Sequence, residues 1–252
     1  MLGPGVTALT AGTHAAKVVG TGTYPSYSVV VPPGWFDMDG YFIVTGPTEP
    51  VLGFSVWDVG QVFRDPRHWQ GQGFDPGPGV ENLVAALVAQ KTRNATTPTD
   101  VTLAGYAGKY LEWSVPADLK SSSWTSFDAC DLDSDGVHHD FLSWLGNGTG
   151  DRYEEVPGQL DQLWVLDVNG QRLVVDATYS PNTSQADRAE LERLVDSLRR
   201  DRRDHRGRRT GHREFRHSPY VRGLRFYPVV GREGTPEGRK RGDDQGYSCP
   251  IQ

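Results

Sequence analysis

The segment Asp131–Gly136 is the part of the sequence whose residue types and spacing most directly suggest chemistry. Three carboxylates at alternate positions, Asp131, Asp133 and Asp135, precede a glycine, and such a turn can place oxygen ligands around Ca²⁺. The loop typical of strong calcium sites has a glutamate at its twelfth position, where this chain has Leu142. The sequence therefore predicts a plain acidic hairpin end and no cofactor. The alternative is a weak calcium site with an incomplete ligand set, in which Asp131, Asp133 and Asp135 are the metal ligands.

Other residue types used in catalysis are present without a recognisable arrangement. The sequence contains no nucleophile elbow, P-loop, HExxH motif or paired Cys and His. Glu154, Glu155 and Asp161 could do acid–base chemistry, but closeness in sequence does not bring carboxylates face to face. His138 and His139 are neighbours on a strand and point to opposite faces, which favours hydrogen bonding over metal binding. The sequence predicts no catalytic residues, and a hydrolase-like enzyme using carboxylates is the alternative.

The elements that position these residues are mostly strands. β-prone runs predict strands over residues 27–31, 41–44, 51–59, 101–103, 106–115, 123–130, 140–145, 163–168 and 172–179. Asn169-Gly170 predicts a tight hairpin turn between the last two. An apolar face predicts a helix over 80–92, and Ser184 with Asp187 starts a second helix over 185–199. This order predicts an α+β domain, an antiparallel sheet with two main helices packed on it.

Charge divides the chain near Arg199. Residues 1–199 hold 12 Lys and Arg against 25 Asp and Glu, a net charge of −13, whereas residues 200–252 hold 14 against 7, a net charge of +7. We therefore predict a flexible linker over 1–25, one globular domain over 26–199 and a basic, disordered tail over 200–252. Two explanations of the tail stay open, a genuine disordered segment and a frameshift product of GC-rich DNA. An intracellular protein that binds nucleic acid through this Arg-rich tail is a further alternative.

The positions of the tryptophans and cysteines indicate where the core lies and whether a disulfide forms, and the apolar segments indicate the cellular location. All seven tryptophans lie between Trp35 and Trp164, which predicts that most of them pack in the core, with an exposed platform for sugars or peptides as the alternative. Cys130 and Cys249 are predicted to be free thiols. The sequence shows no membrane span and no export signal, which predicts a cytoplasmic protein if Met1 is the true start.

Several motifs together resemble a known group of domains. They are SVVVPPGW (28–35), the segment 65–69, DVTLAGYAGKYLEWSVP (100–116), PGQLDQLWVLDVNGQRLVVDATY (157–179) and AELERLVDSLR (189–199). The combination resembles uncharacterised extracytoplasmic domains of high-GC actinobacteria, which sit behind a lipoprotein signal or a membrane anchor. The layout is also similar to the Mog1/PsbP-like sandwich.

The resemblance implies an extracellular or cell-envelope location and no known catalysis. We therefore expect a non-enzymatic monomer that binds an unknown protein or small-molecule ligand through a sheet face or edge. Nucleic acid is not an implied partner, and membrane contact would require an anchor that this chain lacks. The resemblance also implies a disulfide between the positions of Arg67 and Cys130, but the arginine at position 67 prevents that cross-link here.

Overall fold

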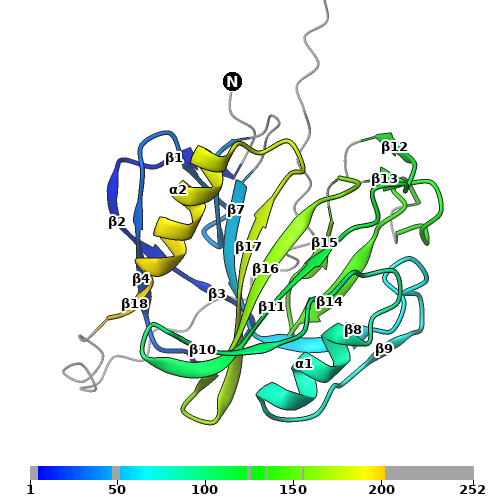
Figure 1. Ribbon diagram of the computed structural model, residues 1–252, viewed down its shortest axis with the longest axis horizontal. Coiled ribbons are helices and arrows are strands. Elements are labelled where there is room, and N and C mark those ends of the chain that lie inside the picture. Colours follow the sequence, from blue (N-terminus) through cyan, green and yellow to red (C-terminus); the bar gives the residue numbers. More distant parts are fainter. Residues whose placement is uncertain (1–4, 47–51, 124–125, 134–135, 155, 202–252) are drawn as a thin grey trace, which may run out of the picture.

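A nine-stranded sheet forms the centre of the molecule, in which every strand pair but one is antiparallel (Figure 1). The computed structural model describes residues 5–46, 52–123, 126–133, 136–154 and 156–201. Along the sheet the strands are β1 (Val6–Ala8), β5 (Phe36–Met38), β6 (Phe42–Val44), β7 (Leu52–Trp57), β17 (Gln171–Tyr179), β16 (Leu160–Val168), β11 (Tyr106–Ser114) and β10 (Thr99–Leu103). The exceptional strand is β3 (Val18–Val19), which runs parallel to β7.

Smaller sheets and two helices surround this sheet. One sheet contains β15 (Asp151–Tyr153), β14 (Leu142–Gly146), β8 (Val59–Phe63) and β9 (Gly73–Phe74), and another contains β18 (Arg199–Arg200), β4 (Tyr27–Val31) and β2 (Gly12–Ala16). A short ribbon pairs β12 (Ser121–Ser123) with β13 (Ser126–Phe127). The helices are α1 (Val80–Val88) and α2 (Gln185–Asp196). The fold is therefore α+β with a predominantly antiparallel sheet, as predicted.

Two apolar clusters occupy the two faces of the main sheet. On one face, Leu191, Leu194 and Val195 of α2 share a buried cluster with residues of β4, β7 and β17. On the other face, residues of α1 and the β8–β14 pair join β11 and β16. The indole rings of Trp57 and Trp144 meet edge to face there, with centroids 5.7 Å apart. Trp35, Trp57, Trp113 and Trp144 are almost fully buried, which confirms the core prediction for these four.

Two local sequence motifs, the Asn169-Gly170 turn and the Ser184 helix start, have the backbone structure predicted for them. Asn169 and Gly170 both have positive φ, 57° and 85°, as the tight β16–β17 hairpin requires. The hydroxyl of Ser184 accepts a hydrogen bond from the Asp187 backbone N–H and begins α2. Both features were predicted from the sequence.

The predicted linker over residues 1–25 is wrong for its described part, residues 5–25. β1 pairs with β5, β2 pairs with β4, and β3 pairs with β7. These strands are short and rich in Gly, Ala and Thr, so they carry little hydrophobic pattern. They belong to the fold because added strands are held by backbone hydrogen bonds and need few large side chains. Ala16, Val18 and Val19 nevertheless reach the core.

The end of the domain lies slightly beyond the predicted boundary. Arg199 and Arg200 form β18 on β4, and the Asp201 backbone N–H donates to the Ser26 carbonyl at 2.8 Å. The predictions for the rest of the tail fall on residues 202–252, outside the described residues.

Neither α1 nor α2 has the length and apolar character needed to cross a bilayer.

Candidate functional site

Strands β11 and β16 present a row of aromatic and polar side chains on one face of the main sheet. Successive strand residues point to opposite faces, so Tyr110 and Glu112 share a face, and the register places them beside Trp164 and Gln162. Tyr179 of β17 extends the row. We call these five residues the aromatic face. All are partly exposed except Tyr179, which is buried.

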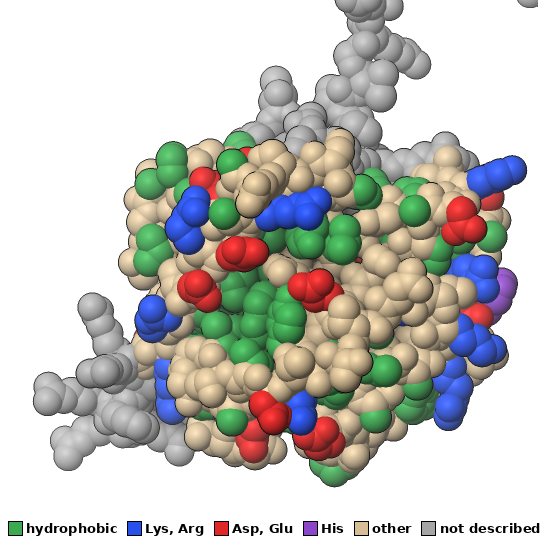
Figure 2. Space-filling view, in the orientation of Figure 1, with side chains coloured by type: hydrophobic (Ala, Val, Ile, Leu, Met, Phe, Trp, Pro, Cys, Tyr) green, Lys and Arg blue, Asp and Glu red, His purple; other side chains and the backbone are tan. Residues whose placement is uncertain are grey.

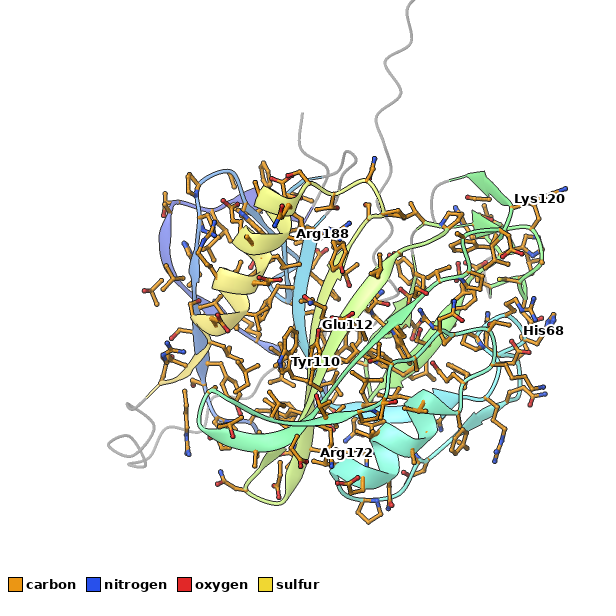
Figure 3. All side chains as sticks on the ribbon, viewed as in Figure 1. His68, Tyr110, Glu112, Lys120, Arg172 and Arg188 are labelled. Carbon is orange, nitrogen blue, oxygen red and sulfur yellow. The ribbon has the colours of Figure 1, made fainter. Side chains whose placement is uncertain are left out.

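The aromatic face lies beyond the area that α2 covers. The helix packs on β4, β7 and β17, and the next strands, β16 and β11, leave their side chains open to solvent in part. Figure 2 shows a hollow of hydrophobic side chains near the middle of this view, with acidic side chains at its border. Figure 3 shows Tyr110 and Glu112 in this central region and Arg188 of α2 above them.

Hydrogen bonds fix the side chains of this row. The rings of Tyr110 and Trp164 lie against each other with centroids 5.0 Å apart. The Tyr110 hydroxyl donates to Glu112 Oε1, and Gln162 Nε2 donates to the Tyr110 hydroxyl at 3.1 Å. Burial and the bond to Glu112 raise the pKa of Tyr110. The phenol therefore stays protonated and continues to donate to the carboxylate.

Arg188 borders the aromatic face from α2. Its guanidinium carbon lies 4.6 Å from the centroid of the Tyr179 ring, a cation–π contact. Burial raises the pKa of Tyr179, Arg188 lowers it, and Glu112 and Glu192 raise it again. The region thus combines ring faces, two carboxylates and one guanidinium that already rests on a ring.

The opposite face of the same strands carries a buried ionic network. We use this name for Arg93, Arg152, Glu154, Asp161 and Asp176, whose exposed fractions are all 8% or less. Arg152 Nε donates to Asp176 Oδ2 at 2.6 Å, and Arg152 Nη2 donates to Asp161 Oδ1 at 2.9 Å. Because Arg152 comes from β15 and the two aspartates from β16 and β17, this network ties the second sheet to the main sheet.

Arg93 forms the other half of the network. It follows α1 and donates to the carboxylate of Glu154, and its Nη1 lies 3.5 Å from Asp161 Oδ2. Its guanidinium stacks between two rings, 4.2 Å from the centroid of Trp113 and 4.7 Å from that of Phe141. A planar, weakly hydrated guanidinium suits such a buried, stacked position better than an ammonium group does.

The ionic network holds three carboxylates and two guanidiniums, so one carboxylate has no matching positive charge. Burial raises the pKa of Glu154 to about 7, against the lowering effect of Arg152 and Arg93. Burial also raises the pKa of Asp176 to about 6, whereas Arg152 and Arg93 lower that of Asp161 despite its burial. We conclude that Glu154 is the carboxyl group of the network that most readily binds a proton near neutral pH, and that Asp176 binds one at lower pH.

This proton makes the stability of the domain depend on pH. Between about pH 4.5 and 7 the folded protein keeps a proton on Glu154 that the unfolded chain has released. The contribution of Glu154 to the free energy of unfolding is therefore expected to fall as pH rises through this window, by up to about 3 kcal/mol in all, of which about 2 kcal/mol is lost between pH 5.5 and pH 8. Denaturant unfolding at pH 5.5 and pH 8 measures the difference.

The variant Glu154→Gln tests the assignment of that proton. Glutamine keeps a hydrogen-bonding side chain but does not titrate, so the loss of stability between pH 5.5 and 8 is expected to shrink by at least half. Asp118→Asn, which neutralises an exposed carboxylate, is the control and should keep the parent slope. An unchanged slope in Glu154→Gln would assign the titration to another group.

The predicted calcium ligands lie elsewhere, at a hairpin end between β13 and β14. Both oxygens of Asp131 have partners, because His68 Nδ1 lies 3.3 Å from Oδ1 and the Gln70 backbone N–H donates to Oδ2 at 2.9 Å. Asp133 Oδ1 accepts from two backbone N–H groups of its own turn, at 3.4 Å each. Asp135 falls outside the described residues. Among the residues that the structure describes, no group of three or more His, Cys, Asp or Glu could hold a metal ion. Calcium binding at this hairpin end therefore stays a prediction.

The sequence indicates some residues of these sites and not others. It named Glu154 and Asp161 as carboxylates without a partner, and the structure brings them together through Arg93 and Arg152. It grouped Trp164 with the core tryptophans, whereas this one is partly exposed. The strict alternation of Tyr110 and Glu112 with buried Leu111 and Trp113 is the signal that could have revealed the aromatic face.

The chain matches no model of a known protein family, and a comparison with curated proteins found no relative.

Proposed function

We propose that this chain is a non-enzymatic binding module of the cell envelope or the extracellular space, and that its ligand contacts the aromatic face. The observation that carries the proposal is the partly exposed Tyr110–Trp164 pair, with Glu112 and Gln162 in the adjacent register position. Aromatic rings beside a few oriented polar groups are typical of small-molecule sites. The resemblance to extracytoplasmic domains supports the location.

The fold proposal is a Mog1/PsbP-like sandwich in which both helices pack on the main sheet. Two features support it. The strand β4 runs into Pro32, Pro33 and Trp35, and the closing helix α2 ends at Ser197-Leu198. The buried residues that α1 and α2 share with strands of the main sheet agree with this arrangement.

The position of the clustered acids favours binding over hydrolysis. A hydrolase needs a pair of carboxylates that a substrate can reach. Glu154, Asp161 and Asp176 are 0–1% exposed and are bonded to arginines, so their arrangement is that of a structural network.

A ligand screen with two matched variants tests the proposed function. The full chain would be melted in the presence of neutral oligosaccharides, amino acids, dipeptides and alkylamines. At least one class is expected to raise the melting temperature of the parent and of the control Tyr41→Ala, and to leave Tyr110→Ala unchanged. Tyr41 is a suitable control because it is also partly exposed but lies between β5 and β6. Equal shifts in both variants, or no shift in any protein, would contradict a binding role for the aromatic face.

A further inference from the structure

We infer that the aromatic face binds a small molecule that carries a primary ammonium group on an alkyl chain. This inference rests on the proposed function and names the chemical class of its ligand. The ammonium would lie at the Glu112 carboxylate, and the alkyl chain would lie along the rings of Tyr110 and Trp164.

The hydrogen-bond inventory of the face favours a ligand that donates. The Tyr110 hydroxyl donates to Glu112 Oε1, and Gln162 Nε2 donates to both the Tyr110 hydroxyl and Glu112 Oε1, at 3.1 and 3.4 Å. The Tyr110 hydroxyl and the Gln162 amide group thus donate within the face. A ligand therefore meets mainly acceptors, the Glu112 carboxylate, the Gln162 amide oxygen and the ring faces, beside the single indole N–H of Trp164. A primary ammonium has three N–H donors and no acceptor, which complements such a set.

The face also holds a cation already. The Arg188 guanidinium lies on the Tyr179 ring, which shows that the aromatic surface accepts a positive charge in this position. Glu112 and Glu192 both raise the pKa of Tyr179, so two carboxylates act on the same ring as this guanidinium.

The charge of the whole domain acts in the same direction. Residues 1–199 carry 12 positive and 25 negative side chains, a net charge of −13. Such a field attracts cations, raises their local concentration and speeds their association at low salt. Charge complementarity thus favours an ammonium compound over a neutral sugar or a carboxylate.

Three small probes of similar size separate charge from apolar contact. The ¹⁵N-labelled full chain would be titrated with butylammonium, 1-butanol and butyrate, with the Trp164 indole N–H signal assigned by comparison with Trp164→Phe. Butylammonium is expected to shift this signal with millimolar affinity, and the affinity is expected to fall as salt rises. In Glu112→Gln the affinity should fall about fivefold, because glutamine keeps the shape and the bond to Tyr110 but loses the charge.

The control and the outcomes distinguish the two proposals. Asp118→Asn removes one exposed charge away from the face and should change the affinity by less than about twofold. If 1-butanol shifts the signal as strongly as butylammonium, or Glu112→Gln binds as the parent does, the ammonium inference is wrong while a binding face remains. If none of the probes shifts the signal and the wider screen also fails, the proposed function is wrong as well.

Discussion

Replacing Arg152 by methionine is expected to lower the free energy of unfolding by about 3–5 kcal/mol at pH 7. The guanidinium contacts Asp161, Asp176 and Glu154. Its removal leaves Glu154 and Asp161 with Arg93, and takes from Asp176 the arginine that it contacts. Burial would lower the pKa of Arg152, but its three acidic partners raise it well above its ordinary value, so it stays charged. Denaturant unfolding of parent and variant measures the loss.

Two further variants keep this prediction testable if Arg152→Met fails to fold. Arg152→Met combined with Asp176→Asn removes one charge of each sign, so this double variant is expected to fold even where Arg152→Met does not, and to lose less free energy of unfolding than that single variant. Arg193→Met, on the exposed side of α2, is the control and should stay within about 0.5 kcal/mol of the parent. A loss below about 1 kcal/mol for Arg152→Met would show that the ionic network contributes little to holding the two sheets together.

Replacing Arg67 by cysteine is expected to create a disulfide with Cys130 and to stabilise the oxidised protein by about 4 kcal/mol, the chain-entropy value for a loop of about 60 residues. The Asp131 backbone N–H donates to the Arg67 carbonyl at 2.7 Å, so residues 67 and 130 belong to adjacent chain segments. Arg67 is also close enough to lower the pKa of the Cys130 thiol. A disulfide between positions 67 and 130, which the resemblance implies for related domains, requires these two chain segments to be adjacent.

The chemistry of Cys130 sets the conditions of that experiment. Burial raises the pKa of its thiol to about 12, so little thiolate exists in the folded protein at neutral pH and oxidation should be carried out during refolding. The variant is made together with Cys249→Ser to prevent mispairing, and Arg67→Ser in the same background is the control. Mass spectrometry identifies the bond, and unfolding with and without reductant measures its effect. A cross-linked protein no more stable than its reduced form would contradict the predicted gain.

Local sequence signals predicted local structure well. Asn169-Gly170 identifies its hairpin because only a positive-φ pair closes a two-residue turn in that way. The apolar spacing of Leu83, Val84 and Leu87 identifies the buried side of α1. In each case a few neighbouring residues contain the whole physical cause of the structure.

Structure that depends on distant partners was not predictable in this way. β1, β2 and β3 exist because other strands offer free backbone groups, and their own residues carry almost no pattern. Arg93 and Arg152 are likewise ordinary arginines in the sequence. Their role depends on carboxylates that come from β16, β17 and the segment after β15, and no spacing rule connects residues on separate elements.

The order of strands in the main sheet determines when, during translation, the domain can close. The central strand β7 pairs with β17, so Val56 finds its partner Val175 only after nearly the whole domain has been synthesised. β4 similarly receives β18 through the pair Ser28–Arg199. Until then the nascent chain exposes the edges of β7 and β4, where a second chain could pair instead. The two sheets can therefore close only after β17 and β18 have been synthesised, and the shorter nascent chain is the form most exposed to mispairing.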